Sequence, residues 1–116
     1  MMLAAIILTL AALGGALMAG IRLRGSPWPP MWLAAGHGVI AATGLTILIY
    51  GALSPGIPTL AQVALAVLVL AALGGAAIFL LYHLKSRPLP IPLVLGHGII
   101  ALSGLAMLWV SIYRVA

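Results

Sequence analysis

Two nearly identical stretches, GHGVIAATGL at 36–45 and GHGIIALSGL at 96–105, each place one histidine between two glycines in otherwise uncharged, apolar sequence. The two histidines, His37 and His97, are sixty residues apart. The heptapeptide LAALGGA recurs at the same offset, at 10–16 and 70–76. Two separate motifs with one common offset predict a tandem duplication of a unit of about sixty residues.

Apolar segments make up most of the chain. Of its 116 residues, 66% are hydrophobic and 4% are charged, whereas water-soluble domains carry about 25% charged residues. Four apolar segments have the ~20 residues that a helix needs to cross a bilayer. They are 2–21, 31–53, 57–82 and 91–113. The sequence therefore predicts an all-α, integral membrane four-helix bundle in contact with the lipid bilayer.

Proline-rich connections separate these segments. They are RLRGSPWPP at 22–30, LSPGIP at 53–58 and KSRPLPIP at 85–92, and proline ends helices. We expect a first two-helix repeat at 1–56 and a second at 57–116, together forming one membrane domain. Because a unit with two spans returns to its starting side, the repeats are expected to be parallel, related by an axis along the membrane normal.

Basic residues predict the orientation in the membrane. Arg22, Arg24, Lys85 and Arg87 lie in the first and third connections, and Arg114 lies at the opposite side. The positive-inside rule places both basic connections in the cytoplasm and both termini outside, in a membrane of the bacterial inner-membrane type. The net charge of +5 is too small to indicate nucleic-acid binding.

Missing residue types exclude several classes of site. The chain has no Cys, Asp or Glu, so thiolate chemistry, iron–sulfur clusters and paired carboxylates for acid–base catalysis are excluded. We therefore expect a non-catalytic subunit rather than a self-sufficient enzyme.

The histidines are the candidate functional residues, because an ionisable side chain within a span indicates a site. Each is the seventh residue of its segment, roughly 9 Å inside the cytoplasmic end, so they are expected to face each other across the bundle. Glycines accompany them. Gly44 and Gly104 lie on the same helical faces, and four more on the antiparallel spans lie at the same depth: Gly14, Gly15, Gly74 and Gly75.

Two interpretations of this arrangement remain open. In the first, small residues allow close helix packing, and the histidines form hydrogen bonds across the interface. In the second, the two imidazoles are the axial ligands of one haem iron, the glycines clear space for the macrocycle, and the four basic residues of the connections bind its propionates.

A resemblance supports the second interpretation. The chain resembles small four-helix membrane b-type cytochromes, in which histidines from different helices are paired axial ligands and glycines admit the haem. The resemblance implies His37 and His97 as metal ligands, with Gly14, Gly15, Gly74 and Gly75 in the clearance role. The chain departs from the common pattern of four ligand histidines and two haems, because its outer half has no histidine.

We expect a membrane b-type cytochrome with one haem b between the second and fourth spans. It would transfer electrons as a subunit of a larger membrane redox complex or in a homo-oligomer, with a quinone as a candidate partner. The alternatives are a subunit that binds chlorophyll-type pigments, with one magnesium on each histidine, and a cofactor-free structural or assembly subunit. His83, at the end of the third span, is interpreted as an interfacial residue, with a propionate or quinone contact as the alternative.

Overall fold

Four long helices account for the apolar segments in the computed structural model, which describes residues 1–115. They are α1 (Met2–Leu23), α2 (Met31–Leu53), α3 (Thr59–Ile78) and α4 (Ile91–Val115), and a π-helical turn η1 (Phe79–His83) continues α3. Each of the four is long and apolar enough to cross a membrane. The predicted all-α, four-helix architecture is confirmed, and every predicted segment boundary lies within two residues of the helix boundary when η1 is counted with α3.

Prolines position the starts of the helices. Pro30 and Pro58 have extended backbone directly before α2 and α3, which suits a residue that has no N–H and a fixed φ. Pro58 also explains why α3 begins at Thr59 and not at 57, because the residue before a proline avoids helical backbone. In the connections, Gly25 and Gly56 adopt φ of +108° and +104°, which side chains disfavour.

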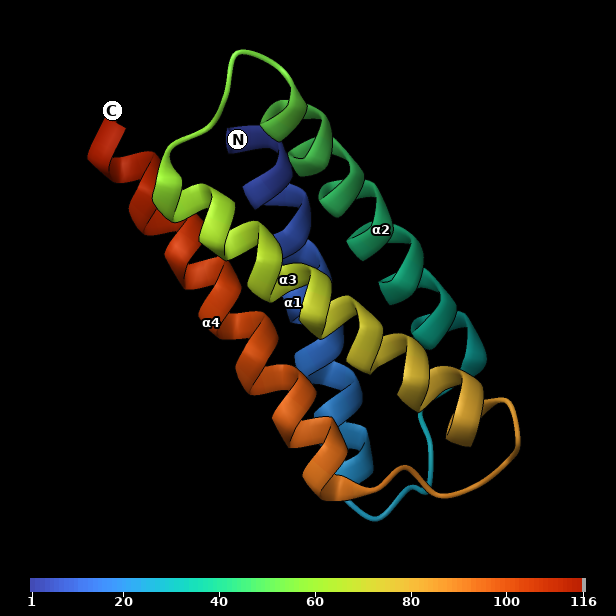
Figure 1. Cartoon of the computed structure of the whole chain (residues 1–116). Helices are drawn as coiled ribbons and strands as arrows, with labels where there is room; N and C mark the ends of the chain where they lie inside the picture. The colour runs from blue at the N-terminus through green and yellow to red at the C-terminus, as the bar shows by residue number, and fades with distance from the viewer. Residues whose placement is uncertain (116) are drawn as a thin grey trace.

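The helices form two antiparallel hairpins, α1–α2 and α3–α4 (Figure 1). The hairpins meet through α1 with α4 and α2 with α3, so α2 and α4 lie diagonally across the bundle. The N-terminus, the end of α4 and the α2–α3 connection share one end, called here the terminal end (Figure 1). The connections 24–30 and 84–90 share the opposite end, called the loop end.

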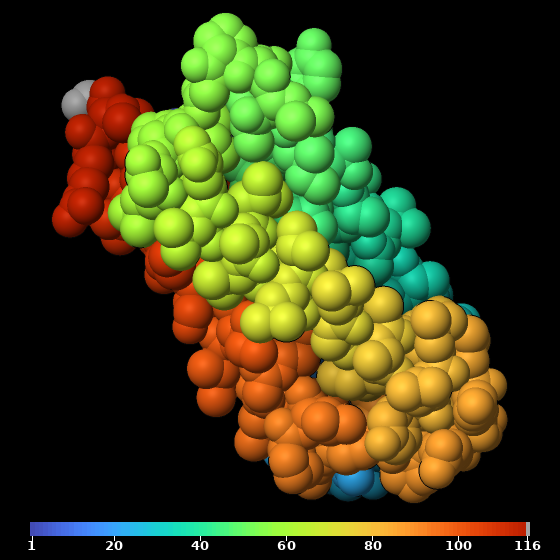
Figure 2. All heavy atoms as spheres, in the orientation of Figure 1, coloured from blue at the N-terminus to red at the C-terminus, as the bar shows by residue number. Residues whose placement is uncertain are grey.

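The bundle is a rod of 44 × 20 × 18 Å (Figure 2), and its outer surface is largely apolar. Large side chains such as Leu13, Leu53 and Leu73 are 64%, 82% and 65% exposed. A water-soluble monomer does not expose so much contiguous apolar area, whereas a helix surface in contact with lipid does.

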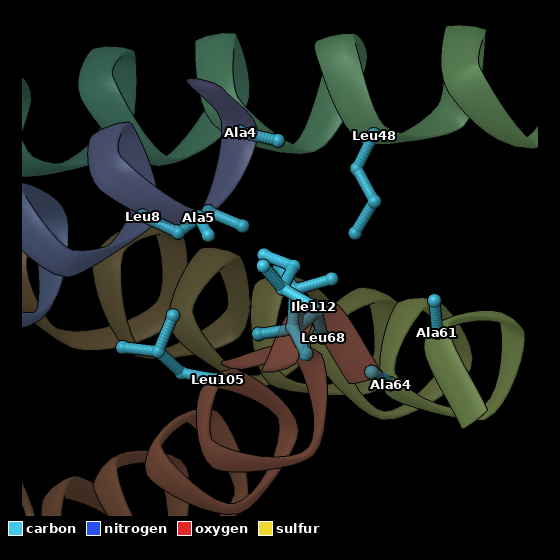
Figure 3. Close-up of a cluster of buried hydrophobic side chains, with 10 residues drawn as sticks. Ala4, Ala5, Leu8, Leu48, Ala61, Ala64, Leu68, Leu105 and Ile112 are labelled. Carbon is cyan, nitrogen blue, oxygen red and sulfur yellow. The ribbon is translucent and has the colours of Figure 1, made fainter. Parts of the chain in front are cut away.

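The cluster of buried apolar side chains lies in the terminal half of the rod, and Figure 3 shows these side chains close up. Its members are alanines, leucines and one isoleucine: Ala4, Ala5, Leu8, Leu48, Ala61, Ala64, Leu68, Leu105, Leu108 and Ile112. In the loop half, comprising 12–43 and 72–103, the buried residues are Pro29, His83 and Leu89, all at or beside the connections. The helices in the loop half therefore have less side-chain packing to hold them together.

Two side-chain hydrogen bonds, together with a backbone hydrogen bond from the Leu89 N–H to the Pro27 carbonyl at 3.0 Å, join the hairpins at the loop end. The Arg22 Nε donates a hydrogen bond to the Leu89 carbonyl at 2.8 Å, and the His83 Nε2 donates to the Pro29 carbonyl at 2.8 Å. The accepting residues, Pro29 and Leu89, are sixty residues apart, whereas the donating residues, Arg22 and His83, are sixty-one residues apart. The π-helical turn explains this, because a π turn takes one residue more than an α turn. It brings His83, instead of Tyr82, to the place that Arg22 has on α1.

Candidate functional site

The two GHG histidines meet in the middle of the bundle. The ring centres of His37 on α2 and His97 on α4 are 6.3 Å apart, and the ring planes are nearly perpendicular, at 89°. Two diagonally opposed helices thus bring together side chains that are sixty residues apart in the sequence.

A backbone carbonyl of the partner helix fixes each imidazole. His37 Nδ1 lies 2.8 Å from the Ala11 carbonyl on α1, and His97 Nδ1 lies 2.8 Å from the Ala71 carbonyl on α3. A carbonyl only accepts, so Nδ1 carries the hydrogen and, in the neutral ring, Nε2 keeps its lone pair. Among residues 1–115, neither Nε2 forms a hydrogen bond. Metal-ligating histidines in proteins are commonly oriented in this way.

The paired glycines of α1 and α3 lie against the imidazole rings. A Cβ atom at Gly15 would lie 3.1 Å from His37 Cε1, and one at Gly75 would lie 2.8 Å from His97 Cε1. Cβ atoms at Gly14 and Gly74 would lie 3.9 and 4.0 Å from the nearest Nδ1 atoms. The sequence predicts that these glycines clear space for a macrocycle, but in the structure the histidine rings fill that space.

Gly44 and Gly104 have another role. A Cβ atom at either position would lie 2.8 Å from a leucine Cγ, that of Leu8 or Leu68 respectively. They therefore permit close approach of the two helices within each hairpin, and the structure places them in helix contacts and not on a cofactor surface. Among the glycines beside the histidines, 36, 38, 96 and 98 have no atom within 4 Å of such a Cβ.

A small apolar cavity separates the hairpins beside the two rings. Its volume is about 80 Å³. The lining consists of six pairs of residues with the sixty-residue offset, namely Leu8 and Leu68, Ala11 and Ala71, Ala12 and Ala72, His37 and His97, Ala41 and Ala101, and Leu45 and Leu105. The surface that faces the space between the histidines is thus built from alanines and leucines.

The basic residues are not part of this cavity. Arg22 is seven residues beyond Gly15 on α1, about 10 Å further along the helix axis, and is tied to the Leu89 carbonyl. The Arg87 guanidinium lies over the Tyr82 ring at 5.4 Å. Arg24 and Lys85 are exposed on the connections at the loop end.

The donor set suits a haem iron better than a metal held by protein alone. Among residues 1–115, no group of three or more His, Cys, Asp or Glu side chains is arranged to hold a metal ion. A haem iron needs only two protein ligands, because the porphyrin supplies the other four. The donors therefore fit, but the enclosed space is smaller than the roughly 300 Å³ of the smaller ligand pockets, so a macrocycle requires the hairpins to move apart around the rings.

The sequence patterns placed Ala41 and Ala101 on the faces of the histidines, but they did not identify the cavity alanines of α1 and α3 or the two carbonyls that hold the rings. The repeated LAALGGA motif was the available signal, since Ala11, Ala12, Ala71 and Ala72 belong to it. The chain matches no protein-family model, no curated protein and no solved structure.

Proposed function

We propose that the chain is an integral membrane protein, formed by tandem parallel two-helix repeats, that binds one b-type haem between His37 and His97. We propose electron transfer as its role, within a larger membrane redox complex of the bacterial inner-membrane type. The observation that carries the proposal is the pair of imidazoles, with Nδ1 anchored and Nε2 unbonded, at a separation of 6.3 Å.

This separation matches trans ligation of one metal. A first-row metal lies about 2 Å from an imidazole nitrogen, so two trans nitrogens are about 4 Å apart and the ring centres about 6 Å apart. The observed 6.3 Å between ring centres agrees with this value. The spacing of the two ring centres therefore supports a metal shared by both imidazoles.

The same distance disfavours a pair of chlorophyll-type pigments. Two stacked macrocycles, each ligated by one histidine, add a contact distance of about 3.5 Å and set the imidazole centres about 10 Å apart. The observed separation of 6.3 Å is too short for that arrangement.

Close packing alone explains less of the geometry. Each histidine forms the hydrogen bond between helices that close packing predicts, from its Nδ1 to a carbonyl of the other helix in its hairpin. Close packing does not account for the approach of the two rings to each other. Both Nε2 atoms lack a hydrogen-bond partner among residues 1–115 and lie on residues that line one apolar cavity. A shared metal provides both nitrogens with a partner.

The walls of the cavity between the two hairpins are suited to a separation of the hairpins beside the histidines. Alanines line the cavity where the hairpins face each other, and the loop half contains no buried apolar cluster among residues 1–115. Separation of the helices beside the rings therefore breaks few buried apolar contacts, while the hydrogen bonds of Arg22 and His83 join the hairpins at the loop end. Haem held by two imidazoles supplies reversible one-electron oxidation and reduction, while the two carbonyls hold the rings and the apolar lining excludes water.

The membrane orientation follows from the basic residues. We propose that the loop end, with Arg22, Arg24, Lys85 and Arg87, faces the cytoplasm and that both termini lie outside. The apolar outer surface and the four helices of spanning length support a transmembrane position.

The test is the visible spectrum of protein purified from cells supplied with haem. The expected result is sharp α and β bands in the reduced-minus-oxidised difference, lost in His37→Ala and in His97→Ala. His83→Gln is the matched control and should keep the bands, since a glutamine amide can still donate to the Pro29 carbonyl. A featureless spectrum of folded wild-type protein, or unchanged bands in both alanine variants, would overturn the proposal.

A further inference from the structure

A second, larger cavity lies at the loop end, away from the paired histidines. Its volume is about 500 Å³, which is in the range of ligand-binding pockets. It is formed by the ends of α1 and η1, the start of α2 and both connections. The lining residues are Ile21, Ser26, Trp28, Pro29, Pro30, Met31, His83, Leu84 and Ser86.

The lining is amphipathic. Ser26, Ser86 and His83 provide polar groups, whereas Met31 and Leu84 provide apolar surface. Such a cavity at the end of membrane-spanning helices lies at the depth of the lipid headgroups, where one part of a ligand is polar and the other apolar.

One buried polar atom at this cavity, Nδ1 of His83, has no hydrogen-bond partner among residues 1–115. His83 is only 7% exposed; its Nε2 donates to the Pro29 carbonyl, and its Nδ1 is buried with no hydrogen bond among residues 1–115. The Nε2 hydrogen leaves Nδ1 of the neutral ring as an acceptor. A buried unpaired acceptor costs about 1–3 kcal/mol, which a hydroxyl donor would offset.

The charged residues that neighbour the cavity lining in the sequence are basic. Arg24 is two residues before Ser26, and Lys85 lies between the lining residues Leu84 and Ser86. Both are exposed, and the chain has no Asp or Glu to neutralise them. Basic pockets at the cytoplasmic ends of spanning helices bind anionic lipid headgroups.

We propose that this cavity binds the headgroup of one anionic phospholipid. Arg24 and Lys85 attract the phosphate, the serine hydroxyls and His83 contact the polar headgroup, and Met31 and Leu84 contact the start of the acyl chains. The proposal does not depend on the haem, because no residue of this cavity lines the cavity between His37 and His97.

The test measures lipid retention by native mass spectrometry on protein released from nanodiscs of phosphatidylglycerol and phosphatidylcholine. Wild-type protein should retain phosphatidylglycerol preferentially. Arg24→Gln and Lys85→Gln should each lower that retention about fivefold, the effect of one basic residue near a membrane surface. Arg114→Gln removes the same charge from the other end of the rod and is the matched control, which should behave as wild type.

Three results would overturn the proposal. The first is equal retention of the two lipids by wild-type protein. The second is an equal loss in Arg114→Gln, which shows a general effect of net charge. The third is stabilisation of detergent-solubilised protein by soluble glycerol phosphate as strong as that by phosphatidylglycerol at equal concentration, which shows that the site binds free phosphate and not a lipid.

Discussion

A Cβ atom added at Gly75 would lie 2.8 Å from Cε1 of His97, closer than real Cβ contacts come. The neighbouring Gly74 has a full 4.0 Å to the same ring. Two adjacent glycines of one motif thus differ sharply in how tightly they lie against a candidate ligand, and they form a natural pair for mutagenesis.

Gly75→Ala should displace the His97 ring and weaken its hydrogen bond to the Ala71 carbonyl. The expected result is a lower haem content per folded protein, whereas Gly74→Ala should be close to wild type. Both are measured as the ratio of haem absorbance to protein at equal helicity. Equal haem content in the two variants would show that the glycine contact does not position the ligand.

Filling the small cavity separates cofactor binding from helix packing. Ala41→Leu and Ala101→Leu place bulk in the space beside the two rings, so haem should be lost. The apoprotein should retain its helicity and insertion, because the added side chain occupies existing space. If haem content is unchanged while the fold is disturbed, the cavity serves packing only.

Gly104→Ala tests a packing role that needs no cofactor. The added methyl meets Leu68 at 2.8 Å, and overpacking typically costs about 1–3 kcal/mol. The unfolding free energy in detergent should fall by this amount with or without haem. Gly98→Ala is the control, since its Cβ meets open space and alanine favours a helix over glycine by up to about 1 kcal/mol.

The proposed orientation predicts where reporters are active. A reporter fused to the C-terminus that functions only outside the cytoplasm should be active, and one that functions only in the cytoplasm should be inactive. The reverse pattern would place the basic loop end outside and remove the argument from the positive-inside rule.

The sequence predicted the helices well because hydropathy is a local signal. The segment 91–113, for example, covers nearly all of α4, whereas the predicted start at 57 lies two residues before α3, which begins after Pro58. The sixty-residue offset predicted that His37 and His97 lie at the same level along the bundle, but it did not predict which neighbouring side chain each glycine faces. Depth follows from counting residues, whereas the contact of Gly75 with a ring and of Gly104 with Leu68 depends on helix rotation and neighbours.

The π-helical turn was also beyond the sequence analysis. Residues 79–83 leave the α conformation, whereas the corresponding residues 19–23 remain in α1. The π turn accompanies a tertiary contact, the hydrogen bond between His83 and the Pro29 carbonyl fifty-four residues away, which no local pattern encodes.

Electron paramagnetic resonance of the oxidised protein tests the central claim most directly, because it reports both the ligands and their orientation. With His37 and His97 on one ferric iron and ring planes at 89°, the account predicts the highly anisotropic low-spin signal typical of near-perpendicular imidazoles, absent from His37→Ala and His97→Ala. Haem-supplied, folded protein without a low-spin ferric signal, or a signal that persists in both variants, would contradict it.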